Sequence, residues 1–220
     1  MTLNTKSKII ATATHIFNNK GFGATNMQDI AGSLYMSRGN LRYHFRDRDA
    51  LLEAIIDELW AKMNAERSKS RALPTFANLH SEVQLYYKFQ KEYSFVFLDT
   101  QVLNHPIVQA RFRQLTEQTI QDNRATLAFA LESGNLQPER IPGTYNSIAF
   151  ITWMLTFYWL SQQIIRGEIA DKDGEKVIWS ILIPHFTEKG LTAFKHYFGE
   201  EYTNSLGEAF HFEGEKPIMF

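Results

Sequence analysis

One short stretch of the chain, residues 38–44, concentrates side chains that donate hydrogen bonds. Its sequence is RGNLRYH, so arginine, asparagine, tyrosine and histidine surround a single leucine. A guanidinium group forms bidentate hydrogen bonds with guanine O6 and N7 or with phosphate, and an asparagine amide can pair with adenine in the same way. Tyrosine and histidine can donate to phosphate oxygens. The pattern therefore favours contact with duplex nucleic acid.

Helical spacing separates these polar side chains from the core. Ser37 is a good N-cap for a helix from Arg38 to about Phe45, and Leu41 shares one face with Phe45. Gly39 in so short a helix costs about 1 kcal/mol relative to alanine, which close approach to a phosphate or base would explain. For any one polar residue, a solvated helix face is the better interpretation. For all of them together on one face, we favour contact with DNA.

A second short helix precedes this one. Thr25 and Gln28 have the spacing of a capping box, and residues 27–31 carry an apolar stripe. Gly32 and Ser33 loosen this helix before Leu34, Tyr35 and Met36, and a tight turn separates the two helices. Two short helices joined by such a turn, with a polar outer face on the second, are the helix-turn-helix pattern.

Longer helices flank this pattern on both sides. The apolar spacing predicts a helix over residues 5–20, which ends at Gly21. Asp47 is a fair N-cap for a fourth helix, of about residues 47–66. Arg48 falls in the first turn of that helix, where backbone N–H groups and the helix dipole also favour a phosphate.

Charge is distributed unevenly along the chain. The net charge is −1, which by itself argues against a general nucleic-acid binder. Residues 1–48 hold seven basic and two acidic side chains, a net charge of +5, whereas the remaining residues carry 16 basic and 22 acidic side chains, a net charge of −6. The asymmetry favours docking on phosphates through the first fifty residues only.

The sequence of these residues also resembles a known family. The segments IFNNKGFGATNMQDIA and SRGNLRYHFRDRDAL resemble the DNA-binding domain of the TetR/AcrR family of bacterial transcriptional regulators, and the match covers roughly residues 5–53. The resemblance implies that Arg48 contacts the DNA backbone. Arg42 departs from the family, in which this position is commonly aromatic, so its base preference is expected to differ. The candidate DNA-binding residues are Thr25, Arg38, Gly39, Asn40, Arg42, Tyr43, His44 and Arg48.

The rest of the chain predicts a larger helical domain. Residues 66–75 are polar and include Pro74, which predicts a junction. Helices are expected over residues 76–101, with a break at Ser94, and over residues 107–132. The stretch from YKFQKEYSFVFLD to NHPIVQARF resembles the effector domain of one TetR subgroup, although this match is looser than the first.

Two long segments near the end of the chain are strongly apolar. Residues 143–166 raise the question of a membrane span, but polar residues interrupt them and no anchoring cluster flanks them, so a buried helix is favoured and no membrane partner is expected. A last helix is expected over residues 173–198, which Pro184 must kink or split. The family resemblance implies that these last two long helices form the interface of a homodimer. Two copies would then read two half-sites of an inverted-repeat operator.

Aromatic residues of the larger domain have two interpretations. An aromatic-rich core accounts for most of them, whereas the family resemblance implies a cavity for a small, mainly apolar effector. Residues with an apolar body and a polar tip are the candidates. They are Tyr86, Tyr93, His105, Trp153, Tyr158 and Gln162.

Enzyme and metal motifs are absent from the sequence. No G-x-S-x-G, Walker or G-x-G-x-x-G motif occurs, the seven histidines show no HxxxH or HExxH pairing, and there are no cysteines. We therefore expect no enzyme activity, no cofactor and no metal. The absence of an apolar segment at the start predicts no secretory signal, and the lack of cysteine suits a cytoplasmic location.

These observations predict an all-α, two-domain, homodimeric transcriptional regulator that binds DNA. Of the two kinds of regulator, a repressor is favoured over an activator. The expected domains are a helix-turn-helix domain (residues 1–50), a helical effector-binding and dimerisation domain (residues 67–198) and an unassigned tail (residues 199–220). The expected partners are an operator in double-stranded DNA and a small-molecule effector of unknown identity. The alternative is a helical ligand-binding or scaffolding protein whose helix-turn-helix no longer engages DNA. A weaker rival is an enzyme with an unrecognised site.

Overall fold

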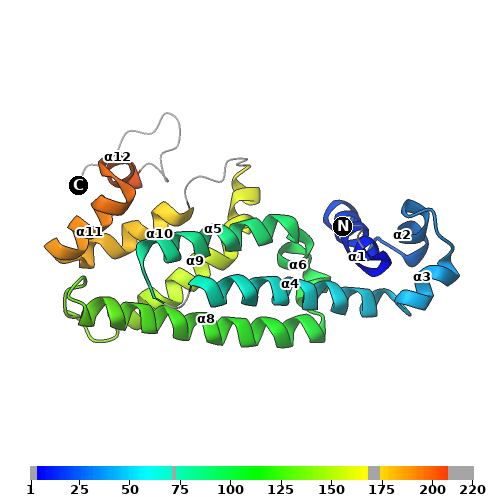
Figure 1. Ribbon diagram of the computed structural model, residues 1–220, viewed down its shortest axis with the longest axis horizontal. Coiled ribbons are helices and arrows are strands. Elements are labelled where there is room, and N and C mark those ends of the chain that lie inside the picture. Colours follow the sequence, from blue (N-terminus) through cyan, green and yellow to red (C-terminus); the bar gives the residue numbers. More distant parts are fainter. Residues whose placement is uncertain (1–3, 71–72, 168–173, 208–220) are drawn as a thin grey trace. The chain divides into compact units, whose positions relative to one another are not determined.

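The computed structural model describes residues 4–70, 73–167 and 174–207. The described part of the chain is helical and contains no strand, which confirms the expected all-α class (Figure 1). The helices in chain order are α1 Thr5–Lys20, α2 Met27–Ser33, α3 Arg38–His44, α4 Arg48–Ser70, α5 Phe76–Glu92, α6 Ser94–Leu98, α7 Thr100–Leu103, α8 Pro106–Glu132, α9 Thr144–Arg166, α10 Gly174–Leu182, the 3₁₀ turn η1 Ile183–His185, α11 Glu188–Phe198 and α12 Glu200–Asn204.

The chain forms two compact units. Unit 1 comprises residues 1–69 and 85–115, and unit 2 comprises residues 70–84 and 116–220. The predicted helix-turn-helix domain of residues 1–50 lies within unit 1, together with most of α4 and the segments around α6 and α7. The fourth helix was predicted to end at about residue 66, but α4 continues without a break to Ser70, so the first part of the predicted junction at residues 66–75 is helical.

α1 has the bounds that its sequence predicts. Asn4 caps its first turn by accepting a hydrogen bond from the Lys6 backbone N–H, and Gly21 ends it with a φ of 83°, a left-handed value that suits glycine. Ile9 and Phe17 are fully buried on the face that packs into unit 1.

The cap of α2 differs from the prediction. Thr25 does not form the capping box, because its hydroxyl donates to the Gly21 carbonyl at 2.9 Å and its side chain is 1% exposed. Asn26 is the N-cap instead: its Oδ1 accepts from Gln28 N at 2.8 Å and Asp29 N at 3.0 Å, and Asp29 Oδ2 accepts from Asn26 N. The capping box is therefore shifted by one residue.

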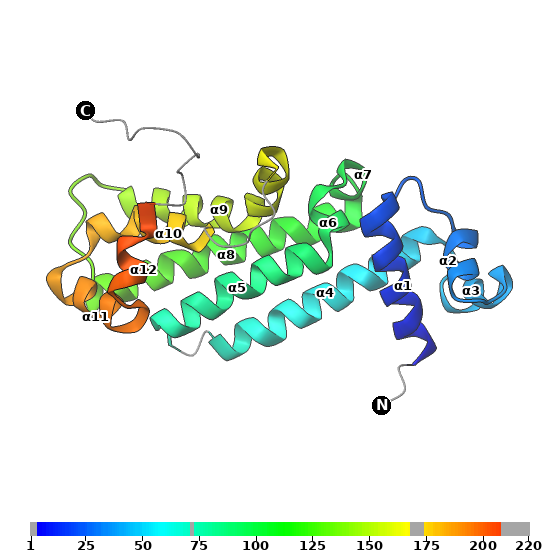
Figure 2. The same ribbon diagram turned by 90° about the horizontal axis from the view of Figure 1, so that it is seen from above.

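Asn18 of α1 connects the helix-turn-helix region to α6. Its Oδ1 accepts from Phe95 N at 3.0 Å, which caps the start of α6, and its Nδ2 donates to the Glu92 carbonyl at 2.8 Å. Beside it, Asp99 Oδ2 accepts from Phe22 N at 2.9 Å. Figure 2 shows α1 lying beside α6 and α7. Since Tyr93, the N-cap residue of α6, makes no side-chain cap of its own, Asn18 supplies it from a distant part of the chain.

Replacing Asn18 with alanine is expected to lower the free energy of unfolding by about 1–2 kcal/mol, because it leaves the partly buried Phe95 N–H without its acceptor. Urea unfolding followed by circular dichroism measures the loss. Asn19→Ala is the matched control, since among the described residues the Asn19 amide hydrogen-bonds only with His15, one turn earlier, and its loss should change stability by less than about 0.5 kcal/mol. Equal losses from both variants would contradict the bridging role.

Unit 2 is built around an aromatic core. Phe194 is fully buried and packs edge-on against Phe76 and Trp179, which places α5, α10 and α11 around one centre. Pro184 splits the predicted last helix into α10 and α11 through η1, as its missing N–H requires. Part of the unassigned tail is helical, because α12 follows Gly199; residues 208–220 lie outside the described part of the chain.

α9 is long and apolar enough to cross a membrane by length and composition alone. A helix that packs within or between soluble proteins passes the same test, and Thr156 and Gln163 are buried among its apolar residues. Such a candidate is weak evidence for a membrane span.

Candidate nucleic-acid interface

α3 presents a polar face to solvent. Ser37 caps it by accepting from Asn40 N at 3.1 Å, as predicted, while Leu41 is fully buried and anchors the helix. The remaining candidates are distributed around that anchor. Those exposed to solvent are Arg38, Gly39, Asn40, Arg42 and Tyr43, whereas His44 is half-buried with its ring 5.3 Å from that of Tyr43. The structure therefore brings five sequence-predicted residues to the surface of one short helix.

Gly39 has no role in packing. A Cβ atom built at this position would meet only Ser37 Oγ, at 3.8 Å, which is an ordinary contact. Since the protein itself leaves room for a side chain here, the glycine is explained better by the close approach of a binding partner, such as a phosphate or a base, to the backbone.

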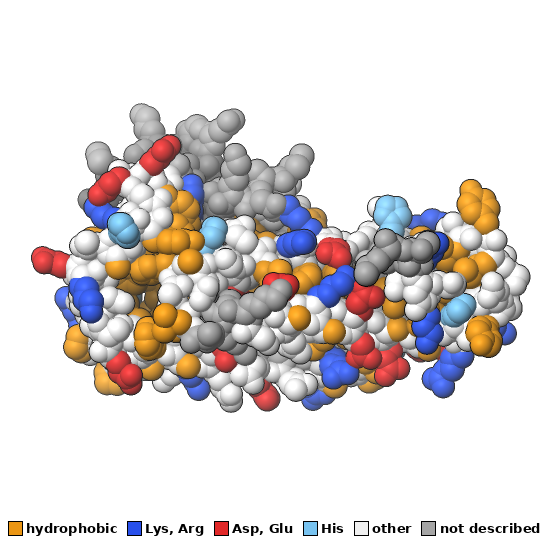
Figure 3. All heavy atoms as spheres, viewed as in Figure 1, with side chains coloured by type: hydrophobic (Ala, Val, Ile, Leu, Met, Phe, Trp, Pro, Cys, Tyr) orange, Lys and Arg blue, Asp and Glu red, His pale blue; other side chains and the backbone are white. Residues whose placement is uncertain are grey.

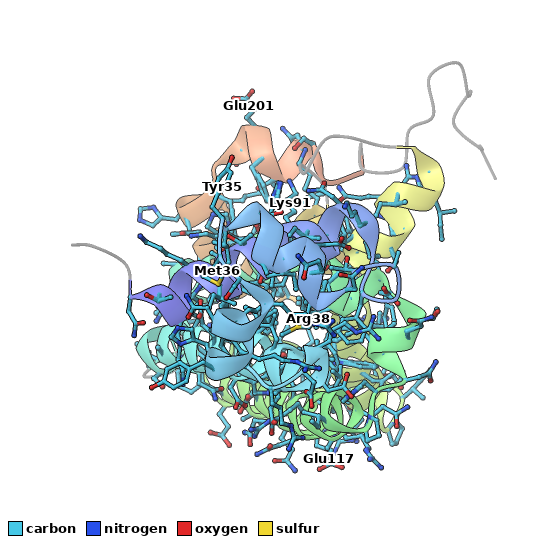
Figure 4. The ribbon with its side chains drawn as sticks, turned by 90° about the vertical axis from the view of Figure 1, so that its right-hand side faces the viewer. Tyr35, Met36, Arg38, Lys91, Glu117 and Glu201 are labelled. Atoms are coloured by element: carbon cyan, nitrogen blue, oxygen red, sulfur yellow. The ribbon has the colours of Figure 1, made fainter. Side chains whose placement is uncertain are left out.

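Tyr35 was missed in the sequence analysis. It lies in the turn between α2 and α3 with a φ of 53°, the only positive φ among described residues other than glycine, and its side chain is fully exposed. Figure 4 shows its side chain projecting away from the ribbon. The left-handed conformation costs a residue with a Cβ about 1–2 kcal/mol. The sequence predicted a tight turn between the two helices but not the left-handed conformation of Tyr35, because tyrosine rarely adopts a positive φ.

Two other candidates make internal contacts instead. Thr25 is buried, so its side chain is not part of this surface. Arg48 Nη1 donates to the carbonyls of Phe22 at 2.8 Å and Thr25 at 3.1 Å, and its guanidinium lies 4.2 Å from the centre of the Phe22 ring. Arg48 thus holds the loop between α1 and α2. Contact of Arg48 with DNA stays a prediction.

Unit 1 exposes further positive side chains outside α3. Lys6, Lys8, Lys20 and Arg46 are exposed in addition to the arginines of α3. The nearest acidic side chain along the chain, Asp47, caps α4 and pairs with Arg46 at 2.9 Å. Its hydrogen bond from the Ala50 N–H, followed by the charge of Arg46, lowers the pKa of Asp47.

α9 exposes a stripe of apolar side chains in unit 2. Its members recur at helical spacing, and charged residues are absent from the stripe. They are Phe150 (45% exposed), Ile151 (39%), Met154 (43%), Tyr158 (50%) and Ile165 (85%). We call these five residues the α9 stripe. A group of exposed apolar side chains on one helix is characteristic of a surface that another protein covers.

The candidate effector residues are divided between the units. Tyr86, Tyr93 and His105 belong to unit 1, and Trp153, Tyr158 and Gln162 belong to α9 of unit 2. Tyr93 Oη accepts from Lys62 Nζ at 2.6 Å, and burial raises the pKa of Tyr93. Among these six candidates, three buried polar atoms have no hydrogen-bond partner within the described residues, namely His105 Nδ1, Trp153 Nε1 and Gln162 Nε2. A bound polar group could satisfy atoms of this kind.

Within the described ranges, no group of three or more histidine, aspartate or glutamate side chains is arranged to hold a metal ion.

Comparisons with known proteins converge on one family. The family of bacterial regulatory proteins called tetR matches residues 9–55, and the bacterial transcriptional repressor family TetR matches residues 52–194. The probable HTH-type transcriptional regulator YttP of Bacillus subtilis is 35% identical over 60 residues, which span 27% of this chain and 29% of that protein.

Solved structures share the fold at low identity. A TetR-family transcriptional regulator from Marinobacter aquaeolei VT8 superposes with a TM-score of 0.79 at 19% identity, over 94% of this chain and 99% of that one. The SmeT–triclosan complex superposes with a TM-score of 0.65 at 15% identity, over 84% of this chain and 92% of that one.

Proposed function

This chain belongs to the TetR family of bacterial transcriptional regulators, and on that premise we propose that it is a DNA-binding repressor released by a small ligand. It binds an inverted-repeat operator in duplex DNA as a homodimer and acts in the cytoplasm without enzyme activity. The observation that carries the proposal is the exposed polar face of α3 around the buried Leu41.

The proposed DNA contacts follow from the exposed side chains. Arg38, Asn40 and Arg42 are the candidates for base edges, while Tyr43 and His44 donate to phosphates. Gly39 lets the backbone approach, and we add Tyr35 as a contact beside the start of α3. The exposed lysines supply the salt-dependent part of the affinity.

Tyr35 provides a test in which stability and binding change in opposite directions. Tyr35→Gly is expected to raise the free energy of unfolding by about 1 kcal/mol, because it relieves the left-handed strain, although a more flexible unfolded chain offsets part of the gain. DNA affinity is expected to fall. Urea unfolding and fluorescence anisotropy measure the two effects. Tyr35→Asn, which also tolerates this φ, is the control for the backbone. Unchanged affinity in both variants would remove Tyr35 from the interface.

The α9 stripe supports the proposed homodimer. A helix-turn-helix unit reads only a few base pairs, so a two-fold dimer with half-sites about 34–36 Å apart, or a multiple of that distance, gives the required specificity. An isologous interface uses the same patch on both copies, and the stripe supplies exposed apolar side chains on one helix for such a patch.

Release by a ligand is the family-based part of the proposal. SmeT, a protein of the same fold, has been solved as a complex with triclosan, so the fold accommodates a small molecule in at least that case. A ligand changes DNA binding only through its different affinity for the DNA-bound and free conformations. The contacts of Asn18 and Asp99 are the route by which a change near α6 would reach α1.

Selection of random duplexes with the purified protein at two salt concentrations tests the function. Enrichment of an inverted repeat is expected and would provide the operator. Salt-sensitive binding without enrichment would instead favour the alternative, a helical ligand-binding protein that no longer reads DNA.

A further inference from the structure

Unit 2 contains a cavity of about 290 Å³ that none of the sequence-predicted effector residues lines. It lies among the start of α5, the end of α8, α10 and α11, and Figure 3 shows hydrophobic side chains around a hollow in this part of the molecule. Its lining is almost entirely apolar. The lining includes the polar residues Thr75, Thr126 and Asn135, together with Ala130, Trp179 and Ala193.

The described lining disfavours a charged ligand. Among the residues that the structure describes, no charged side chain lines the cavity, and two of its three polar residues already have partners in the protein. Thr75 Oγ1 accepts from Asn78 N at 3.2 Å, and Asn135 Nδ2 donates to Ser133 Oγ at 3.2 Å. An ion in this cavity would lose its hydration without gaining a counter-charge, which is strongly unfavourable.

Trp179 is held as a fixed wall of the cavity. Its Nε1 donates to Glu175 Oε1 at 2.9 Å, and the Glu175 carboxylate is 3% exposed. The other oxygen, Oε2, lies 2.7 Å from His80 Nδ1 and accepts from Gln84 Nε2 at 3.0 Å. Because these contacts fix Glu175, they also fix the orientation of the indole, whose ring packs against Phe76.

We propose that this cavity binds a small, uncharged aromatic molecule that packs against the Trp179 indole. Aromatic rings stack favourably on such a fixed ring, and the apolar walls supply the remaining contact. The binding stands independently of DNA recognition. The further step, in which this molecule weakens operator binding, rests on the proposed function.

A pair of fluorescent probes tests whether the cavity prefers an uncharged ligand. N-phenyl-1-naphthylamine is uncharged, and 8-anilinonaphthalene-1-sulfonate carries the same ring system with an added sulfonate. The intact protein is expected to bind the uncharged probe at least about tenfold more tightly than the anionic one. Equal binding of both probes would overturn the proposal, as would no binding of the uncharged one.

Two substitutions that fill the cavity locate the probe. Ala130→Phe fills it from α8 and Ala193→Phe from α11, and each is expected to weaken binding of the uncharged probe at least about tenfold. Ala128→Phe is the matched control, because Ala128 is exposed on the same helix and lies outside the lining, so it should leave binding within about twofold. If a filling variant has the circular dichroism spectrum of the intact protein and binds the probe equally well, the cavity is not the site.

A last experiment distinguishes a failure of the cavity proposal from a failure of the proposed DNA-binding function. Operator binding is measured with and without the uncharged probe, in the intact protein and in Ala130→Phe. We expect the probe to weaken operator binding by the intact protein at least about fivefold and to leave the variant unaffected. Probe binding in the cavity without an effect on the operator would overturn only the regulatory step. Absence of operator binding by the intact protein would overturn the proposed function, while the probe results would still decide the site.

Discussion

A protein carrying both Met154→Glu and Tyr158→Glu is expected to be a monomer that binds its inverted-repeat operator about 10²–10⁴-fold more weakly than the intact protein. Both side chains belong to the exposed α9 stripe. In an isologous interface each substitution appears twice, so the double variant introduces four carboxylates into an apolar contact. Burying such charges without partners costs several kcal/mol, which exceeds what the remaining contacts can offset.

Light scattering after gel filtration measures the mass, and anisotropy with full and half operators measures the affinity. The monomer should retain weak binding to a single half-site, because α3 is in unit 1 and untouched. Ile141→Glu is the matched control: Ile141 is 72% exposed but lies in the loop before α9, so its variant should remain a dimer. A dimeric double variant would show that another surface joins the copies.

Local patterns in the sequence predicted most of the elements. The bounds of α1, the Ser37 cap of α3 and the break at Pro184 follow from rules that act within a few residues. The prediction that Thr25 forms the capping box was wrong, and the reason is also local. Thr25 and Asn26 are both good N-caps, and the choice between them depends on the Gly21 carbonyl, which already holds the Thr25 hydroxyl.

Contacts between distant residues could not be read from the sequence. Arg48 reaches carbonyls more than twenty positions earlier in the chain, so its position in the first turn of α4 suggested a phosphate contact but not the loop that it holds. The cavity in unit 2 combines α5 with α11, over a hundred residues apart. Residue types and helical spacing indicate polar-tipped aromatic side chains, but they do not indicate which helices meet around a cavity.

The polar face of α3, unlike the cavity, could be predicted from the sequence, because the polar residues of one short segment are also the residues that the structure exposes. Arg42→Ala is expected to lower operator affinity by about five- to 150-fold, which corresponds to about 1–3 kcal/mol for loss of a bidentate base contact. Arg42 is exposed on α3, and the described structure gives it no packing role, so stability should not change by more than about 0.5 kcal/mol.

Anisotropy with operators altered at single positions separates the two kinds of contact that Arg42 can make. If Arg42 reads a base, the variant loses discrimination at one position of each half-site and binds the other altered operators with their usual ratios. If it contacts a phosphate, binding weakens equally on every sequence and the slope of log affinity against log salt falls by about one per half-site.

Arg46→Ala is the matched control, since Arg46 is 84% exposed, lies after α3 and pairs with Asp47. It should produce only a small, sequence-independent loss, because removing a positive charge near the DNA weakens the general attraction without removing a base contact. If Arg46→Ala weakened binding as much as Arg42→Ala, with the same salt slope, Arg42 would contribute charge alone, and base reading would have to come from Arg38 and Asn40.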